Sequence, residues 1–471
     1  MKKTQSKKKT LSSFFKVPHV FSLMFIIILV SAGLTYIVPS GEFDRVEDPV
    51  SGRTLVSEGT FHEVPKNPVS LLEVPGLIIS GLNKSSDIIL FIFVVGGSFK
   101  VITSTGAFET VIRSITTKLG KKEILIIPLL LILFSIFGAT IGFSIEGLGL
   151  VPLIIALARS LKYDAITGMA IVLVGAYCGF IAGPMNPFTV GVAQGIAGLP
   201  IYSGMWLRFI ILVVLLIVSS IFLIRYAKMV QADPTKSLVM ELEQNAKGDF
   251  EELQQSSKFQ IKDFLVILTF VFGIGLLIWG VTTKDWYIEQ MAALFLAMGI
   301  ISGICAKFGS SRIAEEFVEG AKAVTLGALV VGIARAIPVA LEEGYIIDSL
   351  INGISSIIML MPDSMKVLSI YFAQNVINFF INSGSGQAAV TMPIMIPLGD
   401  LVGITRQTTV LSFHLGDGFT NLIFPTGSTM MAYLAASGIS YNKWVKFIWP
   451  LVLIFIIIGA IFVVFAHIIQ Y

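Results

Sequence analysis

Residues 144–157, SIEGLGLVPLIIAL, align without a gap with residues 385–398, SGQAAVTMPIMIPL. The register continues along the chain, so that Gly175 pairs with Gly416 and Pro184 with Pro425. Each copy interrupts one apolar stretch with glycine, serine or amide residues and interrupts the next with a proline-containing break. Paired broken segments in the two halves of a membrane protein are typical of the substrate site of a secondary transporter.

The composition indicates a polytopic membrane protein. Of the 471 residues, 55% are apolar and 13% are charged, which lies far outside the usual range of soluble domains. The first apolar run is too long for a removable signal peptide and lacks a small-residue cleavage site, so we expect a retained span. Runs long enough to cross about 30 Å of hydrocarbon lie at 18–38, 86–105, 204–226, 264–283, 287–306, 324–342 and 444–469.

Several classes of function are not favoured. The net charge of +3 reflects loop ends of the cytoplasmic type and indicates no nucleic-acid surface. Cys178 and Cys305 lie in apolar segments, where buried thiols are expected, and the four histidines show no ligand spacing. No GxxxxGK[ST] motif occurs, so transport would not use bound ATP. We expect no enzymatic activity, no cofactor, no nucleic-acid partner and no metal except a sodium ion at the hairpin tips.

Charge distribution predicts the orientation. Lysines place the N-terminus inside, and the acidic segment 40–70 fits the outside. If 123–138 and 148–161 are the arms of one re-entrant hairpin, both of its ends lie inside, beside basic residues. A second hairpin, with arms near 366–381 and 388–402, then enters from the outside. Nine full spans, two opposed hairpins and an outside C-terminus follow.

The predicted fold class is an all-α polytopic membrane protein built from an inverted repeat, with two opposed re-entrant hairpins and broken helices. The expected parts are a first repeat at 1–226 (hairpin 123–161, broken span 164–200), a cytoplasmic linker at 227–262, a connecting span at 263–286, and a second repeat at 287–471 (hairpin 366–402, broken span 404–438).

Four broken elements are expected to converge near the membrane midplane. Glycine permits tight turns at the hairpin tips, and proline frees a backbone carbonyl. Helix N-termini then present N–H groups to a carboxylate, while carbonyl, hydroxyl and amide oxygens can hold a cation. Packing of small residues is the alternative explanation. The candidates are Thr140, Gly142, Ser144 and Glu146 in the first tip, Met185 and Asn186 in the first break, Asn382, Ser383, Ser385 and Gln387 in the second tip, and Thr426 and Ser428 in the second break.

Charged residues inside apolar segments mark functional sites by default. Glu146 lies in the first tip, and His414, Asp417 and Asn421 fall on one helical face. That face could bind an amino group, a proton or a sodium ion, although a histidine there is more often a satisfied core residue. Lys100 and Arg335 are candidate counter-ions for these acids, or side chains that reach toward the membrane interface.

Long motifs resemble those of the YfcC-like family, which is related to the anaerobic four-carbon dicarboxylate carriers within the ion-transporter superfamily. These motifs are KVPHVFSLM to VPSGEFDR (16–45), MNPF (185–188), VAQGIAGLP (192–200), FFINSGSGQAAVTMPIMIPLGDLVG (379–403) and HLGDGFTNLIFPT (414–426). Members are described as basic amino acid antiporters, some of them similar to arginine/ornithine exchangers. The resemblance implies an elevator-type fold and a homodimer. Relatives often carry two adjacent acids at the first tip, where this chain has Ile145 and Glu146.

The sequence therefore predicts an antiporter of basic amino acids, of the arginine/ornithine type, in a bacterial cytoplasmic membrane. Its partners are a small-molecule substrate and the lipid bilayer. A dicarboxylate or other organic-anion carrier, coupled to sodium or protons, is the close alternative, favoured by the related family, by Lys100 and by Arg335. A remote alternative is an intramembrane aspartyl protease using Asp164 and Asp417. Duplicated broken hairpins disfavour a channel.

Overall fold

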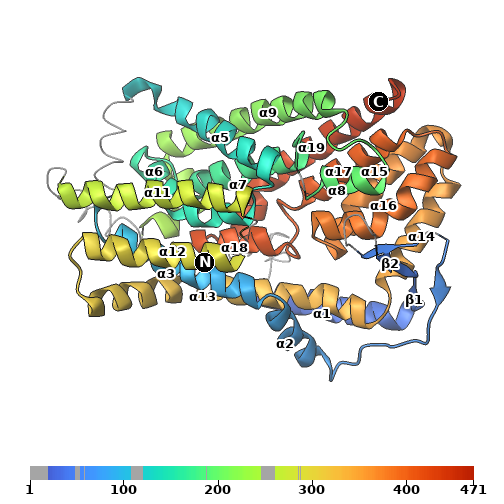
Figure 1. Cartoon of the computed structure of the whole chain (residues 1–471), viewed down its shortest axis with the longest axis horizontal. Coiled ribbons are helices and arrows are strands. Elements are labelled where there is room, and N and C mark those ends of the chain that lie inside the picture. The colour runs from blue at the N-terminus through green and yellow to red at the C-terminus, as the bar shows by residue number, and fades with distance from the viewer. Residues whose placement is uncertain are drawn as a thin grey trace, which may run out of the picture.

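The structure is a computed structural model that describes residues 20–47, 54–57, 59–107, 120–186, 188–244, 260–284, 286 and 288–471. It is almost entirely helical (Figure 1). In the first half the helices are α1 (Val20–Ile37), α2 (Val74–Lys84), α3 (Ser86–Thr103), η2 (Gly120–Leu125), α5 (Ile126–Ile141), η3 (Ile145–Leu150), α6 (Val151–Ser160), α7 (Ala165–Ala182), α8 (Val190–Ile196), α9 (Met205–Ala232) and η4 (Pro234–Lys236). In the second half they are α11 (Ile261–Thr283), α12 (Ile288–Cys305), α13 (Ser310–Glu343), α14 (Ile347–Leu360), α15 (Asp363–Phe380), α16 (Gly384–Leu401), α17 (Arg406–Thr420), α18 (Ser428–Ser437) and α19 (Tyr441–Ile468).

Four short strands depart from the all-α expectation. They lie between α1 and α2, in residues 40–69, which we call the outer segment. Strand β1 (Gly41–Glu42) pairs with β4 (His62–Glu63), and β2 (Arg45–Glu47) pairs with β3 (Thr54–Val56), both antiparallel. In the described residues of this segment, the two strand pairs satisfy backbone N–H and C=O groups that no helix pairs.

One group of helices is organised by α13, which packs against α1, α2 and α3, while α12 packs against α3 and α11 (Figure 1). Small residues allow the close crossings: a Cβ atom on Gly320 would lie 2.3 Å from the carbonyl oxygen of Gly96. Close backbone approach at glycine is the usual means of packing helices in lipid, where no hydrophobic force drives them together.

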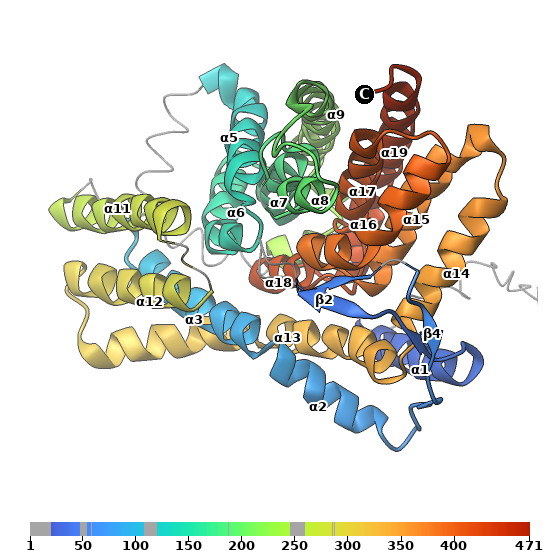
Figure 2. The same ribbon diagram turned by 45° about the vertical axis from the view of Figure 1, so that its right-hand side comes forward.

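The second group is arranged around two helices that are buried over almost their whole length, α7 and α17. Helix α7 lies against α5 and α6, and α17 lies against α15 and α16. Helix α9 then packs on α7 as α19 packs on α17, whereas α8 contacts α16 and α18 contacts α6. Figure 2 shows these two sets side by side. The segments that are paired in the sequence alignment therefore make matching contacts. Helices within each half pack against one another, and α8 and α18 each contact a helix of the other half.

Helix α7 is positioned by a glycine series on the face that meets α5. Gly175, Gly179 and Gly183 recur every four residues, so they line one side of the helix. A Cβ atom on Gly179 would lie 2.0 Å from the carbonyl oxygen of Ser135, and one on Gly138 of α5 would lie 2.1 Å from that of Ala176. The two backbones are therefore in contact, and this contact sets where the end of α7 and the first tip lie.

In the described residues, seven helices are long and apolar enough to cross a membrane, namely 86–103, 123–140, 165–182, 205–232, 288–305, 310–343 and 441–468. The run predicted at 18–38 corresponds to a shorter apolar helix, and the run at 324–342 is part of a helix of 34 residues. The stretch 123–140, predicted as a re-entrant arm, is itself long enough to span, and the re-entrant arrangement stays a prediction. The N-terminal lysines, Pro187 and residues 245–259 of the predicted linker lie outside the described residues.

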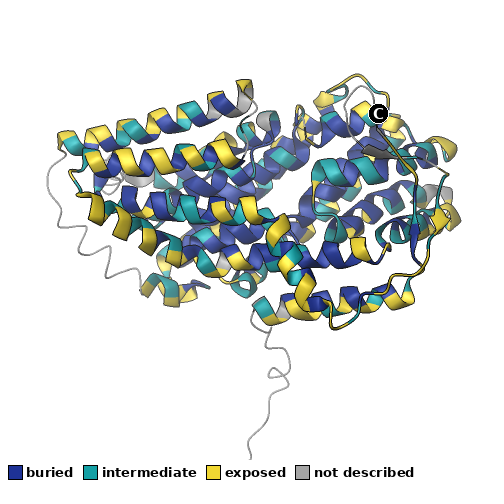
Figure 3. Ribbon diagram, turned by 60° about the horizontal axis from the view of Figure 1, so that its bottom comes forward, coloured by how far each residue is buried: buried dark blue, intermediate teal, exposed yellow. Residues whose placement is uncertain are grey.

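Many residues on the outer faces of the helices are exposed (Figure 3), and a large number of them are apolar. Helix α9 exposes Phe209, Ile217 and Ile221, and α19 exposes Ile457 and Ile461. Exposed apolar side chains on helices long enough to span a membrane form the surface expected to face lipid.

Candidate functional site

The two hairpin tips and the broken helices enclose a central cavity of about 530 Å³. This volume lies in the range of small-molecule sites. Residues from both halves of the chain line it, and among the predicted site residues these are Gly142, Ser144, Glu146, Arg335, Asn382, Ser383, Ser385, Asn421 and Ser428. The structure therefore brings together nine of the candidates named from the sequence.

The first tip directs a carboxylate into the cavity. Helix α5 ends at Ile141 and is followed by Gly142, whose φ of 66° favours glycine. The chain then begins the 3₁₀ helix η3 rather than an α-helix, and the backbone N–H of Ser144 donates to Oε2 of Glu146 at 2.7 Å. One carboxylate oxygen is thus held by the tip's own backbone, and the Glu146 side chain lines the cavity.

Tyr433 connects the first tip to the other half of the chain. This side chain on α18 is fully buried, and its hydroxyl donates to the carbonyl oxygen of Ser144 at 2.6 Å. Gly147 makes room for it, because a Cβ atom there would lie 2.1 Å from the tyrosine oxygen. Ser144 therefore donates to Glu146 through its backbone N–H and accepts from Tyr433 through its carbonyl oxygen.

Replacing Tyr433 by phenylalanine is expected to weaken substrate binding about tenfold and to leave the fold intact. The change removes one buried hydrogen bond and leaves the Ser144 carbonyl unpaired, which costs about 1–3 kcal/mol. Equilibrium binding of labelled substrate to the purified variant measures the effect. Tyr441→Phe is the matched control, because its hydroxyl donates to the Ile423 carbonyl at 2.9 Å, outside the cavity lining. Equal affinities of the two variants would contradict this role.

The second tip is held by an amide network. Helix α16 begins at Gly384, and the Ser383 hydroxyl accepts from the Gly386 N–H at 3.3 Å. The Asn382 side chain donates to Oδ1 of Asn421 at 2.6 Å, and Asn378 donates to the same oxygen at 2.9 Å. Asn421 follows the last residue of α17. The second tip is therefore tied to the break in its own half.

Asp417 lies directly behind the second tip. A Cβ atom on Gly384 would lie 3.3 Å from its Oδ2, and 2.5 Å from Cγ2 of Thr189. Neither carboxylate oxygen of Asp417, nor the Thr189 hydroxyl, has a hydrogen-bond partner among the described residues. Leaving such oxygens buried and unpaired is costly. The absence of a side chain at Gly384 places this acid next to the cavity.

The structure separates the two predicted counter-ions. Arg335 lines the central cavity, and within the described residues it makes no ion pair. Lys100 is exposed and packs beside Gly320. It follows the cavity-lining Ile88 by twelve residues, a separation of about 18 Å along α3. Lys100 therefore does not line this cavity, and its predicted role as a counter-ion or as a side chain that reaches toward the membrane interface stays a prediction.

The remaining candidates lie near the cavity without lining it. Gln387 turns into its own hairpin and donates to Oε1 of Gln374 at 2.8 Å. Asn186 donates to the Phe180 carbonyl at 3.1 Å, and Thr140 donates to that of Ile136 at 2.7 Å. Met185 is exposed, and Thr426 is buried. The Asn186 and Thr140 side chains thus satisfy local backbone carbonyls, whereas the buried Thr426 hydroxyl has no hydrogen-bond partner among the described residues.

His414 behaves as the core histidine that its position in an apolar helix favours. Its Nε2–H donates to the carbonyl oxygen of Phe180 at 2.9 Å, at the end of α7. His414 does not line the central cavity. His414, Asp417 and Asn421, which were predicted to share one helical face, thus lie in three different environments, because each side chain contacts a different element.

The geometry does not support an aspartyl dyad. Asp164 caps α7, and its carboxylate accepts hydrogen bonds from the backbone N–H of Thr167 at 2.9 Å, from Tyr226 at 2.7 Å and from Ser237 at 2.7 Å. Phe180 and Asp417 both lie beside Gly384, and Phe180 follows Asp164 by sixteen residues along α7. That separation is about 24 Å, too far for two carboxyls to share a proton.

Sequence reasoning missed several residues of the cavity lining. They are Ile88, Ile145, Tyr177, Phe180, Phe188, Trp286, Ile288, Gly384 and Thr429. Most are aromatic or aliphatic, and in an apolar chain such residues give no signal that separates a site from a core. Gly384 and Thr429 lie directly beside named candidates, so adjacency to the tip and to the break was the available signal.

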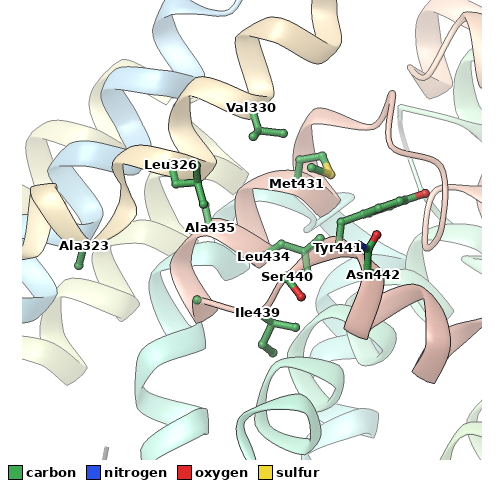
Figure 4. Close-up of a pocket in the computed structure, with 11 residues that line it drawn as sticks. Ala323, Leu326, Val330, Met431, Leu434, Ala435, Ile439, Ser440, Tyr441 and Asn442 are labelled. Carbon is green, nitrogen blue, oxygen red and sulfur yellow. The ribbon is translucent and has the colours of Figure 1, made fainter. Parts of the chain in front are cut away.

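A second, smaller cavity of about 200 Å³ lies between the two helix groups. Figure 4 shows Leu326 and Val330 of α13 facing Met431 and Leu434 of α18 across it, with Tyr441 at the start of α19. The contact between α13 and α18 is therefore incompletely filled on this side.

Comparison of the sequence with known proteins identifies a family and two relatives. The family model for the C4-dicarboxylate anaerobic carrier, DcuC, matches residues 17–468. The "Putative basic amino acid antiporter YfcC" of Escherichia coli is 33% identical over 97% of both chains. An "Uncharacterized protein" of Haemophilus influenzae is 28% identical, again over 97% of both.

Two solved transporters align over nearly the whole chain. The YdaH transporter of Alcanivorax borkumensis gives a TM-score of 0.40 at 12% identity, covering 96% of this chain and 99% of that one. MtrF of Neisseria gonorrhoeae gives 0.43 at 16% identity, covering 95% of each. Both TM-scores are below 0.5.

The apolar helices, the cavity between broken elements and the relatives define a multi-pass membrane transport protein. The chain belongs to the DcuC family, and its resemblance to YfcC-like proteins is confirmed.

Proposed function

We propose that this transporter exchanges amino acids with basic side chains, of the arginine/ornithine type, by alternating access. The observation that carries the proposal is the set of charges around one cavity: the Glu146 carboxylate and the Arg335 guanidinium on its wall, and Asp417 behind Gly384. Arg335 pairs with the substrate's α-carboxylate, for which its planar donors are suited. Glu146 and Asp417 receive the two positive groups.

Charge balance supports this assignment over a neutral substrate. With both acids ionised, the three side chains sum to one negative charge, and a basic amino acid carries one positive charge. Desolvated charges inside a membrane protein are stable only when paired. A substrate of complementary charge is therefore favoured, and an exchange of one such substrate for another leaves the balance unchanged.

For the movement, we infer an elevator-type displacement of α5–α9 and α15–α19 against α1–α3 and α11–α14. The matching contacts of the two sets around α7 and α17 support an inverted repeat that moves as one body. The partly empty contact between α13 and α18 supports a sliding boundary (Figure 4). In this proposal the two tips are re-entrant and meet at the midplane.

A dicarboxylate carrier is the second candidate. Arg335, free of ion pairs within the described residues, favours it, as does the description of the family as C4-dicarboxylate carriers. Under this alternative the helix N-terminus at Gly384 would assist Arg335 in holding two carboxylates. Glu146 argues against it, because a third carboxylate would face the ligand.

Counterflow in liposomes distinguishes the two candidates. Proteoliposomes are loaded with ornithine, and uptake of labelled arginine is followed with unlabelled lysine, succinate or aspartate outside. The proposal expects uptake that requires internal ornithine and is inhibited by lysine. Inhibition by succinate or aspartate, together with no dependence on ornithine, would show an organic-anion carrier instead.

The other expectations stay predictions: a homodimer, an N-terminus on the inside, and location in the bacterial cytoplasmic membrane. Light scattering of the purified protein in detergent checks the first, and labelling of a cysteine placed near the N-terminus checks the second.

A further inference from the structure

A separate cavity of about 490 Å³ adjoins the central one. The start of the outer segment, the corner between α13 and α14, and the second hairpin form its walls. Arg335, Asn382 and Ser383 line both cavities. The two spaces therefore meet at these three side chains, and a molecule in the outer cavity would have to pass them to reach the central one.

The outer wall of this cavity is fixed to the α13–α14 corner. The Gly41 N–H donates to the Tyr345 carbonyl at 2.8 Å, and the Ser40 hydroxyl donates to that of Gly344 at 2.9 Å. The Phe43 N–H donates to Oδ2 of Asp348 at 3.0 Å. Backbone bonds on both sides of Glu42 thus hold that residue in place.

The charges of the cavity are unequally engaged. Arg45 pairs with the buried Asp348 at 2.9 Å, and Glu342 pairs with Lys84 at 2.7 Å. Glu42 and Arg335 line the same cavity and have no ion pair among the described residues. The cavity therefore offers one free carboxylate and one free guanidinium. This combination is complementary to the ammonium and carboxylate groups of a free α-amino acid.

We propose that this outer cavity is a second binding site, at which an amino acid is held by Glu42 and Arg335 before it enters the central cavity. The inference rests on the proposed function, in which the substrate is an amino acid. It adds a second location on the substrate's path and the two residues that bind it there. Arg335 lines both cavities, and its guanidinium has five N–H donors, so it can donate to one carboxylate in each cavity at the same time. Glu42 belongs to the outer site alone.

The test is the number of arginine molecules bound per chain. Labelled arginine is titrated onto the purified protein in lipid nanodiscs, and the expected stoichiometry is two. Glu42→Gln should reduce it to one, keep the affinity of the remaining site, and raise the external KM of counterflow about tenfold. Glu343→Gln is the matched control, because Glu343 lies next to the lining residue Glu342 and does not itself line the cavity. This variant should still bind two arginine molecules.

A second variant guards against a folding defect in the first. Val390 lines the outer cavity on α16, and Val390→Phe fills that space from the opposite wall, so it too should bind one arginine. One arginine per wild-type chain would overturn the outer site while leaving the proposed function standing. Two per chain in both variants would also overturn it. Binding of succinate with no binding of arginine would overturn the proposed function itself.

Discussion

Glu146→Gln is expected to reduce counterflow of labelled arginine to about a tenth or less, since a hydrogen bond to a charged group contributes about 1.5–3 kcal/mol. The glutamine oxygen still accepts from the Ser144 N–H, which holds Oε2 of Glu146 at 2.7 Å in the wild type. The shape of the first tip is therefore kept while its negative charge is lost. Uptake into ornithine-loaded liposomes measures the effect.

The control for this experiment is Glu289→Gln, which removes the same charge from an exposed position on α12. It should leave arginine uptake unchanged. Wild-type rates in Glu146→Gln would contradict a role for this carboxylate in recognising a cationic substrate. Faster uptake of succinate by Glu146→Gln than by the wild type would favour the anion carrier, because the change removes a repulsive charge.

Gly179→Ala is expected to cost at least about 3 kcal/mol of stability, at the upper end of overpacking effects. The new Cβ atom would lie 2.0 Å from the Ser135 carbonyl oxygen and 2.7 Å from the Ala139 backbone nitrogen. Both are backbone atoms of α5, so no side chain can move aside. The two helices must separate along their whole contact, and the first tip must move with them.

Thermal unfolding of the purified protein measures this prediction, with yield of folded protein as a second readout. Gly33→Ala is the control, because no atom lies within 4 Å of the Cβ position there. It should unfold at the wild-type temperature or slightly above, since alanine has a higher helix propensity than glycine. Equal unfolding temperatures for the two variants would show that α5 and α7 are less closely packed than the structure has them.

Local patterns in the sequence determined the helical, membrane-spanning character and the positions of the tips and breaks. The apolar runs predict helices because their length matches the hydrocarbon thickness. Gly142 marks the end of α5, because glycine permits a left-handed turn, and the paired Pro184 and Pro425 lie in the breaks after α7 and α17, because proline lacks an N–H. These effects act within a few residues, so a single sequence reveals them.

Only the tertiary structure decided which candidates share a cavity. The hydroxyl of Tyr433 reaches the Ser144 carbonyl across 289 positions, and no local pattern marks a tyrosine for that contact. Arg335 and Lys100 looked equivalent in the sequence, yet only Arg335 lines the cavity. The physical reason is that the packing of whole helices fixes which face of each one meets the site. That packing depends on close backbone contacts such as that of Gly179 with Ser135, which form only when distant segments come together.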